Sequence, residues 1–375
     1  MYDLARANSL NGNSAEALRL LHALAAAGLG SDALESDHFA ALRAAAGWGE
    51  LRAKLEAIKA PVTRGSTAFT IPERDLIPES IAHDPKTRRF YVGSLHKAKI
   101  VRLDGEGRRG DFVVGGQDGL AAVLGMKVDA RRRLLWVCNA VLPELRGYDK
   151  ARDGTAAVHK YDLDTGKLIK KYTLENKPDR HLLNDIAIGD GGDAYITDSL
   201  AGLVYVIPAA KDELQPLVQL GRYNYPNGIA LSKDEKRLYV ADMEGITVID
   251  IGAKTQSKLG HPETIALTGA DGLYLYENSL IAVQNSNPPP NRVMRFFLSE
   301  KGDRVESARV VESNHPLYNV PTTGVVVGDS LFYVANSQLD SFDSNRIIHP
   351  LNRLSDVIIL KTPLDAPPRR SSEGP

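Results

Sequence analysis

The sequence is poor in features that would tie the chain to itself by covalent bonds or attach it to a large polyanion. It has one cysteine, Cys138, among 375 residues, so no disulfide can form between two of them. Because Cys138 lies in an apolar strand-like run, we expect a buried structural thiol. The formal net charge is −1, and without a basic excess we expect no nucleic-acid partner.

Long hydrophobic runs are also missing. No apolar stretch approaches the roughly 20 residues that cross a bilayer, so the sequence predicts no membrane span. The first ten residues, MYDLARANSL, lack the basic segment and apolar core of a secretory leader. Tyr2 nevertheless enters a helical pattern without a preceding cap, as it would if a leader had been trimmed. We expect a periplasmic or secreted location in that case and a cytoplasmic one otherwise.

What the sequence does contain is a motif that recurs six times, at intervals of roughly 43 to 60 residues. Each copy opens with a mostly polar residue, continues with a small and an apolar residue, and is followed by a short strand rich in Tyr, Val and Ala. One four-stranded sheet per period is typical of a β-propeller. The six opening residues are Glu79, Leu124, Asn184, Asn227, Asp271 and Thr323.

We therefore predict an all-β six-bladed β-propeller over residues 61–365. A small α-helical domain over residues 1–60 should precede it, and a disordered tail over residues 366–375 should follow. The strand-like segment 66–72 is expected to join the last blade, over 320–363, and so close the ring. The longest insertion, 140–156, lies inside the second blade, where a long loop is typical of a ligand opening.

The N-terminal residues follow a helical spacing of apolar side chains. Ser14 is a suitable N-cap and Gly28 can end the helix, while a second pair of helices is expected over 37–46 and 48–58. Residues 2–29 resemble a tetratricopeptide helical hairpin. Because one such pair cannot bury its own apolar face, we expect it to pack on the propeller or on a protein partner, or to be a cap without a binding role.

If each motif begins the innermost strand of a blade, Glu79, Asn184, Asn227 and Asp271 converge on the central shaft. Two carboxylates and two amide oxygens suit Ca²⁺ first and Mg²⁺ or Mn²⁺ next, with Zn²⁺ only as a substitute. Asn-Gly and Asp-Gly pairs are also favoured turns, so each residue alone has a structural explanation. Their shared position in the repeat favours a metal site.

Four stretches together resemble the senescence-marker-protein/gluconolactonase (regucalcin-like) superfamily of six-bladed propellers. They are IPESIAHDPKTRRFYVGSL, LLNDIAIGDGGDAYITDS, YPNGIALSKDEKRLYVADM and GADGLYLYENSLIAVQ. The resemblance implies that the same four residues hold a central divalent ion, usually Ca²⁺. It also implies that Asp271 is a general base or nucleophile in the hydrolysis of a lactone, an ester or an organophosphate. Leu124 and Ala140 stand where paraoxonase-like members have histidines, so a histidine dyad is not expected.

The sequence thus predicts a Ca²⁺-dependent hydrolase acting on a small lactone or ester. His181, three residues before Asn184, is a second catalytic candidate, as an acid or base. One alternative is a non-catalytic, metal-stabilised propeller that binds a ligand or a protein. Another is a strictosidine-synthase-like condensation, for which we identify no glutamate base.

Overall fold

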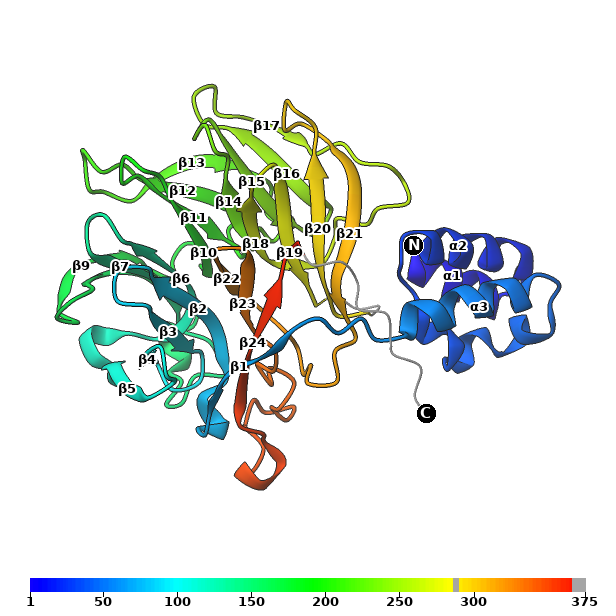
Figure 1. Cartoon of the computed structure of the whole chain (residues 1–375), viewed down its shortest axis with the longest axis horizontal. Helices are drawn as coiled ribbons and strands as arrows, with labels where there is room; N and C mark the ends of the chain where they lie inside the picture. Colours follow the sequence, from blue (N-terminus) through cyan, green and yellow to red (C-terminus); the bar gives the residue numbers. More distant parts are fainter. Residues whose placement is uncertain (286–289, 366–375) are drawn as a thin grey trace.

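The computed structural model describes residues 1–285 and 290–365. It contains six four-stranded antiparallel sheets and a group of helices at the N-terminus (Figure 1). The prediction of a six-bladed β-propeller with a small N-terminal helical region is therefore confirmed. The tail predicted over 366–375 lies outside the described residues.

Five blades are each formed by four strands that follow one another in the chain. From the innermost strand outward they are β2 (Pro78–Asp84), β3 (Arg89–Ser94), β4 (Lys99–Leu103) and β5 (Arg109–Val113); β6 (Ala122–Asp129), β7 (Leu134–Ala140), β8 (Ala156–Asp162) and β9 (Leu168–Leu174); β10 (Leu183–Ile188), β11 (Ala194–Asp198), β12 (Leu203–Ile207) and β13 (Gln215–Gln219); β14 (Ile229–Leu231), β15 (Arg237–Asp242), β16 (Gly245–Asp250) and β17 (Thr255–Lys258); and β18 (Ala270–Tyr276), β19 (Ser279–Gln284), β20 (Arg292–Leu298) and β21 (Val305–Ser313).

The sixth blade joins the two ends of the propeller. It consists of β22 (Gly324–Val327), β23 (Ser330–Val334), β24 (Val357–Pro363) and, on the outer edge, β1 (Ser66–Ile71). β1 pairs antiparallel with β24, from Ser66 opposite Lys361 to Ile71 opposite Val357. This closure was predicted from the sequence. Because β1 from the start of the propeller pairs with β24 from its end, the ring is closed, and the inner strands are held around a central shaft.

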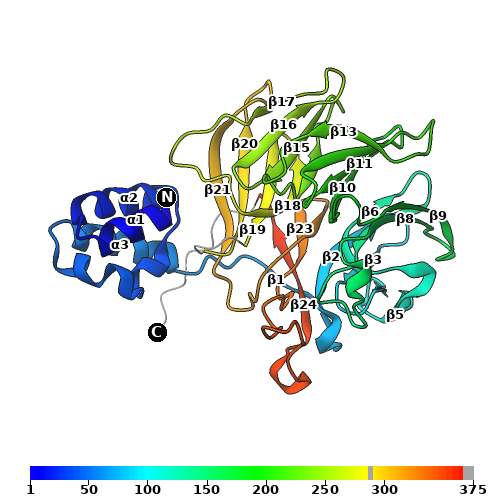
Figure 2. The ribbon, with the colours of Figure 1, turned by 180° about the vertical axis from the view of Figure 1, so that it is seen from behind.

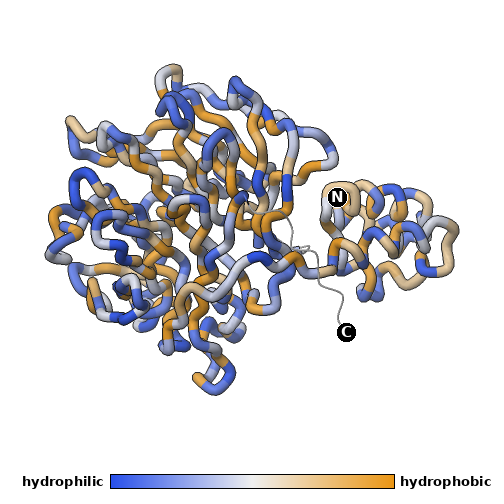
Figure 3. Tube along the Cα trace, viewed as in Figure 1, coloured by the Kyte–Doolittle hydropathy of each residue, from blue (hydrophilic) through white to orange (hydrophobic). Residues whose placement is uncertain are grey.

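Hydrophobic side chains on the strands hold the blades together. Val137 in β7 and Val240 in β15 are two fully buried examples. Figure 3 shows the hydrophobic segments concentrated along the strands and the hydrophilic ones in the loops around them. Burial of these apolar side chains between the sheets is the dominant favourable contribution to such a fold. The loops at the two ends of the shaft contribute less to this core and are therefore available for a binding site.

The N-terminal helices form a compact unit with a core of its own. They are α1 (Tyr2–Leu10), α2 (Ser14–Ala26), η1 (Ser31–Leu34), η2 (Asp37–Ala44) and α3 (Trp48–Lys59), where η marks a 3₁₀ helix. Ala5, Leu21, Phe39 and Leu51 are fully buried among them. The helix expected over 37–46 is a shorter 3₁₀ helix. The helical hairpin of residues 2–29 covers its apolar face with η2 and α3 and does not need the propeller for this. The tetratricopeptide likeness stays a prediction.

The helical unit lies beside the blade of β18–β21 (Figures 1 and 2). Asn314, just after β21, donates from Nδ2 to the backbone oxygen of Ile58 at 2.9 Å. Arg292 at the start of β20 donates from Nη1 to the backbone oxygen of Gly28 at 2.9 Å. These side chains recognise backbone carbonyls at helix ends, so the contact is polar and specific in position. In the described part of the chain, no helix combines the length and apolarity needed to cross a membrane.

Three further 3₁₀ helices lie in the connections of the propeller: η3 (Arg74–Leu76), η4 (Gln117–Gly119) and η6 (Leu351–Arg353). A fourth, η5 (Lys150–Arg152), lies in the loop 140–156. That loop joins β7 to β8, as the sequence predicted.

We expect His159 in β8 to make the stability of the second blade fall in mild acid. His159 is fully buried, and its Nδ1 lies 2.7 Å from Nδ2 of Asn139. Burial lowers the pKa of His159 to about 4. The Lys171 charge acts in the same direction, and the hydrogen bond to the Asp118 backbone oxygen acts against it. In the unfolded chain His159 binds a proton near pH 6.5, whereas in the folded chain it does so only near pH 4. The free energy of unfolding therefore decreases as the pH falls from about 6.5 to about 4, by up to about 3 kcal/mol.

Urea unfolding of the protein and of His159→Gln, at pH 7 and pH 5, measures this loss. The variant removes the titrating ring and should lose less stability over the same interval, whereas His261→Gln, at an exposed site, should behave like the parent chain. Equal losses in all three proteins would contradict the assignment.

Candidate metal and catalytic site

Three of the four predicted ligands lie at irregularities in the innermost strands. The pairing of β2 with β3 changes register across Glu79, that of β10 with β11 changes across Asn184, and that of β18 with β19 changes across Asp271. A residue at such a bulge leaves the hydrogen-bond ladder, and its side chain is redirected. The local backbone therefore releases these side chains from the alternation of the strand.

The small residue of the repeated motif has a clear structural cause. A Cβ on Gly228 would lie 2.5 Å from the backbone oxygen of Asp271, and one on Gly125 would lie 2.5 Å from the backbone oxygen of Asn184. Neither contact is possible, so any side chain there would push two innermost strands apart. The glycines thus allow neighbouring blades to approach closely around the shaft, which brings the preceding residues of the motif near one another.

Asp271 lies at the centre of a small amide cluster. Asn227 donates from Nδ2 to Asp271 Oδ1 at 2.8 Å, and Asn285, directly after β19, donates from Nδ2 to Asp271 Oδ2 at 2.6 Å. The structure thus brings together Asn227 and Asp271, which are 44 residues apart. Sequence reasoning missed Asn285, although it ends one of the recurring Tyr/Val/Ala-rich strands.

Asn184 reaches the same region through a serine. Its Nδ2 donates to Ser199 Oγ at 2.9 Å, and Ser199 Oγ donates to the backbone oxygen of Pro226 at 2.6 Å. Pro226 immediately precedes Asn227. With its amide nitrogen engaged by Ser199, Asn184 is oriented so that its oxygen is the group left for a ligand.

Glu79 and Asp271 are both buried, with 6% and 7% of their surface exposed. Burial raises the pKa of Glu79 well above its usual value, and the nearby Asp271 and Asp185 charges raise it further. Burial also raises the pKa of Asp271, while the hydrogen bonds from Asn227 and Asn285 lower it. Without a positive charge, these carboxylates resist simultaneous ionisation.

Two oxygens at this point lack partners. Glu79 Oε2 and Asn227 Oδ1 are buried without a hydrogen bond from any described residue. Buried polar atoms are nearly always paired, so orphaned oxygens call for a specific explanation. A carboxylate and an amide oxygen in this state fit a hard cation such as Ca²⁺. No three His, Cys, Asp or Glu side chains of residues 1–285 and 290–365 cluster as metal ligands, so a cation here depends on the asparagine oxygens.

Thr323 and Leu124, the remaining opening residues of the motif, have other roles. Thr323 Oγ1 donates to the backbone oxygen of Glu79 at 2.7 Å, which fixes the strand that carries Glu79. Leu124 is 4% exposed and packs in the apolar core between the second and third blades. It does not line the hollow described below.

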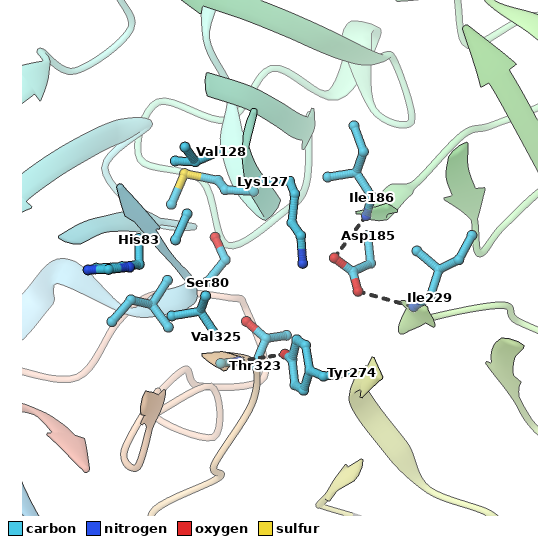
Figure 4. A pocket seen from close by; sticks show the side chains of 14 residues that line it. Ser80, His83, Lys127, Val128, Asp185, Ile186, Ile229, Tyr274, Thr323 and Val325 are labelled. Carbon is cyan, nitrogen blue, oxygen red and sulfur yellow. Dashed lines mark hydrogen bonds between the residues drawn. The ribbon is translucent and has the colours of Figure 1, made fainter. Parts of the chain in front are cut away.

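Further along the shaft lies a small cavity of about 20 Å³, drawn in Figure 4. Asp185 accepts hydrogen bonds there from the backbone nitrogens of Ile186 at 2.8 Å and Ile229 at 3.2 Å. Burial raises the pKa of Asp185 to about 6. The amine of Lys127 points into the same cavity (Figure 4), and its charge favours the ionised form of Asp185. Burial lowers the pKa of the Lys127 amine, and the Asp185 charge opposes this shift.

His181 is held by a buried aspartate. Its Nδ1 lies 2.6 Å from Asp198 Oδ2, and Asp198 Oδ1 accepts from the backbone nitrogen of Leu182 at 2.9 Å. Because Nδ1 is engaged by the carboxylate, Nε2 is the ring nitrogen left for another partner. The arrangement orients the imidazole as an acid or base would need, but His181 is not among the residues that line the hollow beside Asp271.

That hollow has a volume of about 480 Å³ and contains Asp271, Asn227 and Asn285. Tyr225 borders it and has a backbone φ of 48°, a left-handed conformation that is uncommon for a bulky residue and often marks functional sites. Burial raises the pKa of the Tyr225 hydroxyl, and the charges of Asp271, Glu79 and Glu144 raise it further. Tyr225 is therefore a protonated donor at the hollow, which sequence reasoning missed although the residue lies inside the YPNG motif.

Comparison with known proteins gives distant likenesses. No protein-family profile matches the chain. The chain is 24% identical over 195 residues to lactonase drp35 of Staphylococcus aureus, a match that covers 44% of this chain and 57% of that protein. The chain thus spans little more than half the length of this curated relative.

Solved structures with the same fold are numerous. A gluconolactonase from Xanthomonas campestris has a TM-score of 0.52 at 16% identity and covers 81% of this chain and 94% of its own. A PQQ-bound aldose sugar dehydrogenase from Streptomyces coelicolor has a TM-score of 0.53 at 16% identity, with 81% and 99% covered. The allergen Mala s 1 of Malassezia sympodialis reaches 0.60 at 13%, with 81% and 98% covered. Such varied proteins share a fold, which agrees with the resemblance seen in the sequence, and they show no more than the fold.

We expect Ca²⁺ to bind at Glu79 and to stabilise the protein. Calorimetric titration at pH 8 should give one site, and the melting temperature should rise with Ca²⁺ because a ligand that binds the folded chain stabilises it. Burial raises the pKa of Glu79, so Ca²⁺ competes with a proton for this carboxylate and binding should weaken as the pH falls.

Glu79→Gln should abolish the heat of binding and the Ca²⁺-dependent rise in melting temperature. Glu106→Gln, at a side chain 73% exposed, should retain both. Undiminished binding to Glu79→Gln would place the ion elsewhere.

Proposed function

We propose that this protein is a Ca²⁺-dependent hydrolase of lactones or esters, with the ion held by Glu79, Asn184, Asn227 and Asp271. The observation that carries the proposal is the pair of orphaned buried oxygens, Glu79 Oε2 and Asn227 Oδ1, beside a buried carboxylate that faces a hollow. The likeness to a lactonase and the shared fold of a gluconolactonase support it.

Bound Ca²⁺ would supply a Lewis acid that polarises the carbonyl of the substrate and favours the charge that develops on its oxygen. The chain's own contribution begins with position. Hydrogen bonds to both oxygens of Asp271, from Asn227 and Asn285, hold this carboxylate at the edge of the hollow. Because Asp271 is fixed before substrate arrives, little reorganisation is needed when the reaction starts.

Asp271 is proposed to take a proton from the attacking water, or to attack the carbonyl itself. Both roles need the ionised carboxylate, and the two amide hydrogen bonds lower the pKa of Asp271 against the effect of burial. As a base, Asp271 removes a proton of water while the water oxygen bonds to the carbonyl carbon. The bond between this carbon and the leaving-group oxygen then breaks, and the leaving oxygen takes up the proton that Asp271 accepted. In a lactone the leaving group stays attached to the acyl part, so the product is a single hydroxy acid.

His181 is proposed to help the proton leave or return. The bond from its Nδ1 to Asp198 leaves Nε2 for a proton relay, as in other carboxylate-oriented histidines. Since His181 lies outside the lining of the hollow, it would act through a water rather than on the substrate directly.

Asp271→Asn is the central test of the proposal. With Ca²⁺ present, the parent protein should hydrolyse at least one member of a panel of γ- and δ-lactones and aryl acetates, measured as acid release at constant pH. The variant should lose at least about 10²-fold in kcat because it removes the base or nucleophile, while its circular dichroism spectrum and its melting cooperativity stay those of the parent.

Asp250→Asn is the matched control. Asp242, which lines the hollow, pairs with the first residue of β16, Gly245, whereas Asp250 is exposed at the other end of that strand. It should keep full activity. Turnover of no substrate by the parent protein, with Asp271→Asn altering only the melting temperature, would favour the non-catalytic module predicted as the alternative.

His181→Gln separates a proton-transfer role from a structural one. Loss of an acid or base should lower kcat by about 10² or more, leave KM nearly unchanged and remove one limb of the pH profile of kcat. A purely structural histidine would instead lower the melting temperature and leave the shape of the pH profile intact. His38→Gln, at an exposed histidine of the helical unit, should change neither.

A further inference from the structure

Exposed hydrophobic side chains gather at one opening of the propeller. Tyr223 is 88% exposed, Met243 is 66% exposed and Tyr225 is 41% exposed. Tyr225 and Met243 border the hollow that contains Asp271. With Tyr223 and Leu200 they also line an adjoining hollow of about 520 Å³. Hydrophobic groups exposed together beside a polar site typically mark a surface that binds something.

A residue of the helical unit completes this surface. Leu29, three residues after α2, lines the hollow together with Asp271 and Asn227. It is placed there by Arg292, whose Nη1 donates to the backbone oxygen of Gly28 at 2.9 Å. The closeness of this contact is shown by Gly28, on which a Cβ would lie 2.8 Å from Arg292 Nη1. The hollow beside Asp271 is therefore walled partly by the propeller and partly by the helical unit.

We propose that Leu29, Tyr225 and Met243 form a subsite for an apolar arm of the substrate, continued outward by Tyr223 and Leu200. This inference rests on the proposed function and narrows it to lactones or esters that carry an alkyl or aryl chain. The helical unit then determines specificity, because it supplies Leu29.

The occupant follows from the continuity of the two hollows. Tyr225 and Met243 belong to both, so a molecule whose carbonyl lies at Asp271 can extend past these two side chains from one hollow into the other. Each hollow has the size of an ordinary small-molecule pocket. The amide-rich floor and the apolar walls match the two ends of an amphipathic small molecule, with a polar ring at Asp271 and a chain against Leu29 and Met243.

The test uses the full chain loaded with Ca²⁺ and γ-lactones whose alkyl substituent grows from none to seven carbons. A buried methylene contributes up to about fourfold in affinity, so kcat/KM should rise at least about tenfold over the series. Leu29→Ser and Met243→Ser should each lower kcat/KM about tenfold for the longest lactone and less than twofold for the unsubstituted one. Leu10→Ser, at a leucine of α1 that is 63% exposed, should change neither value.

A second measurement does not depend on catalysis. The corresponding alkyl lactams, which resist hydrolysis, should bind more tightly with increasing chain length by calorimetry, and the gain should disappear in Met243→Ser. Met243 is exposed, so this variant remains folded even if Leu29→Ser does not. If no lactone is hydrolysed but the lactams bind in this way, the proposed reaction fails and the apolar subsite stands.

A flat dependence on chain length in both measurements overturns the subsite. So does an equal loss for short and long lactones in the variants. Dimers in size-exclusion chromatography that Met243→Ser dissociates would assign the rim to a second copy of the chain. Retention on phosphatidylcholine vesicles that the same variant abolishes would assign it to a lipid surface, and either result contradicts the proposal.

Discussion

The close approach of the six innermost strands is the constraint on which the site depends. Gly228 lies against the backbone of Asp271, and Gly125 lies against the backbone of Asn184, so adjacent blades meet without intervening side chains. Closure of the ring by β1 and β24 holds the strands at this separation. A space so narrow admits few side chains and little water. The residues that enter it at the bulges of β2, β10 and β18 are therefore buried whatever their charge.

Burial of charge has to be compensated, and the shaft does so in two ways. Deeper in the shaft, Asp185 has two backbone hydrogen bonds and the amine of Lys127. At the level of Glu79 and Asp271, amide groups satisfy Asp271, but Glu79 Oε2 has no described partner. Replacing both carboxylates by apolar groups would remove the like-charge repulsion but would leave the amide nitrogens of Asn227 and Asn285 without an acceptor. The unpaired oxygen of Glu79, together with Asp271 at the hollow, is why we propose that the site binds a cation.

The repeat predicted much of this arrangement because the motif carries its own structural reason. At Asn227 the following glycine, Gly228, lies against the backbone of Asp271, whereas the glycine after Asp271, Gly272, lies against the side chain of Tyr274. The side chains between repeats have no such signature. Nothing in the sequence around Asn285 indicates that its side chain donates to Asp271. The position of Tyr225 depends on its left-handed backbone conformation, which the sequence motif does not predict. Leu29 lies in another structural unit, so its position depends on a contact that no periodicity in the sequence describes.

That contact links the helical unit to the proposed site through a short series of bonds. Arg292 is 2% exposed, and burial lowers its pKa to about 10. It donates from Nε to Gln284 Oε1 at 2.7 Å and from Nη1 to the backbone oxygen of Gly28, and Gln284 is the neighbour of Asn285 in the chain. Moving the helices away would break the hydrogen bond from Arg292 to the Gly28 carbonyl. Arg292 therefore contacts both the segment that carries Leu29 to the wall of the hollow and Gln284, the chain neighbour of the residue that donates to Asp271, so one buried arginine joins the helical unit to the site.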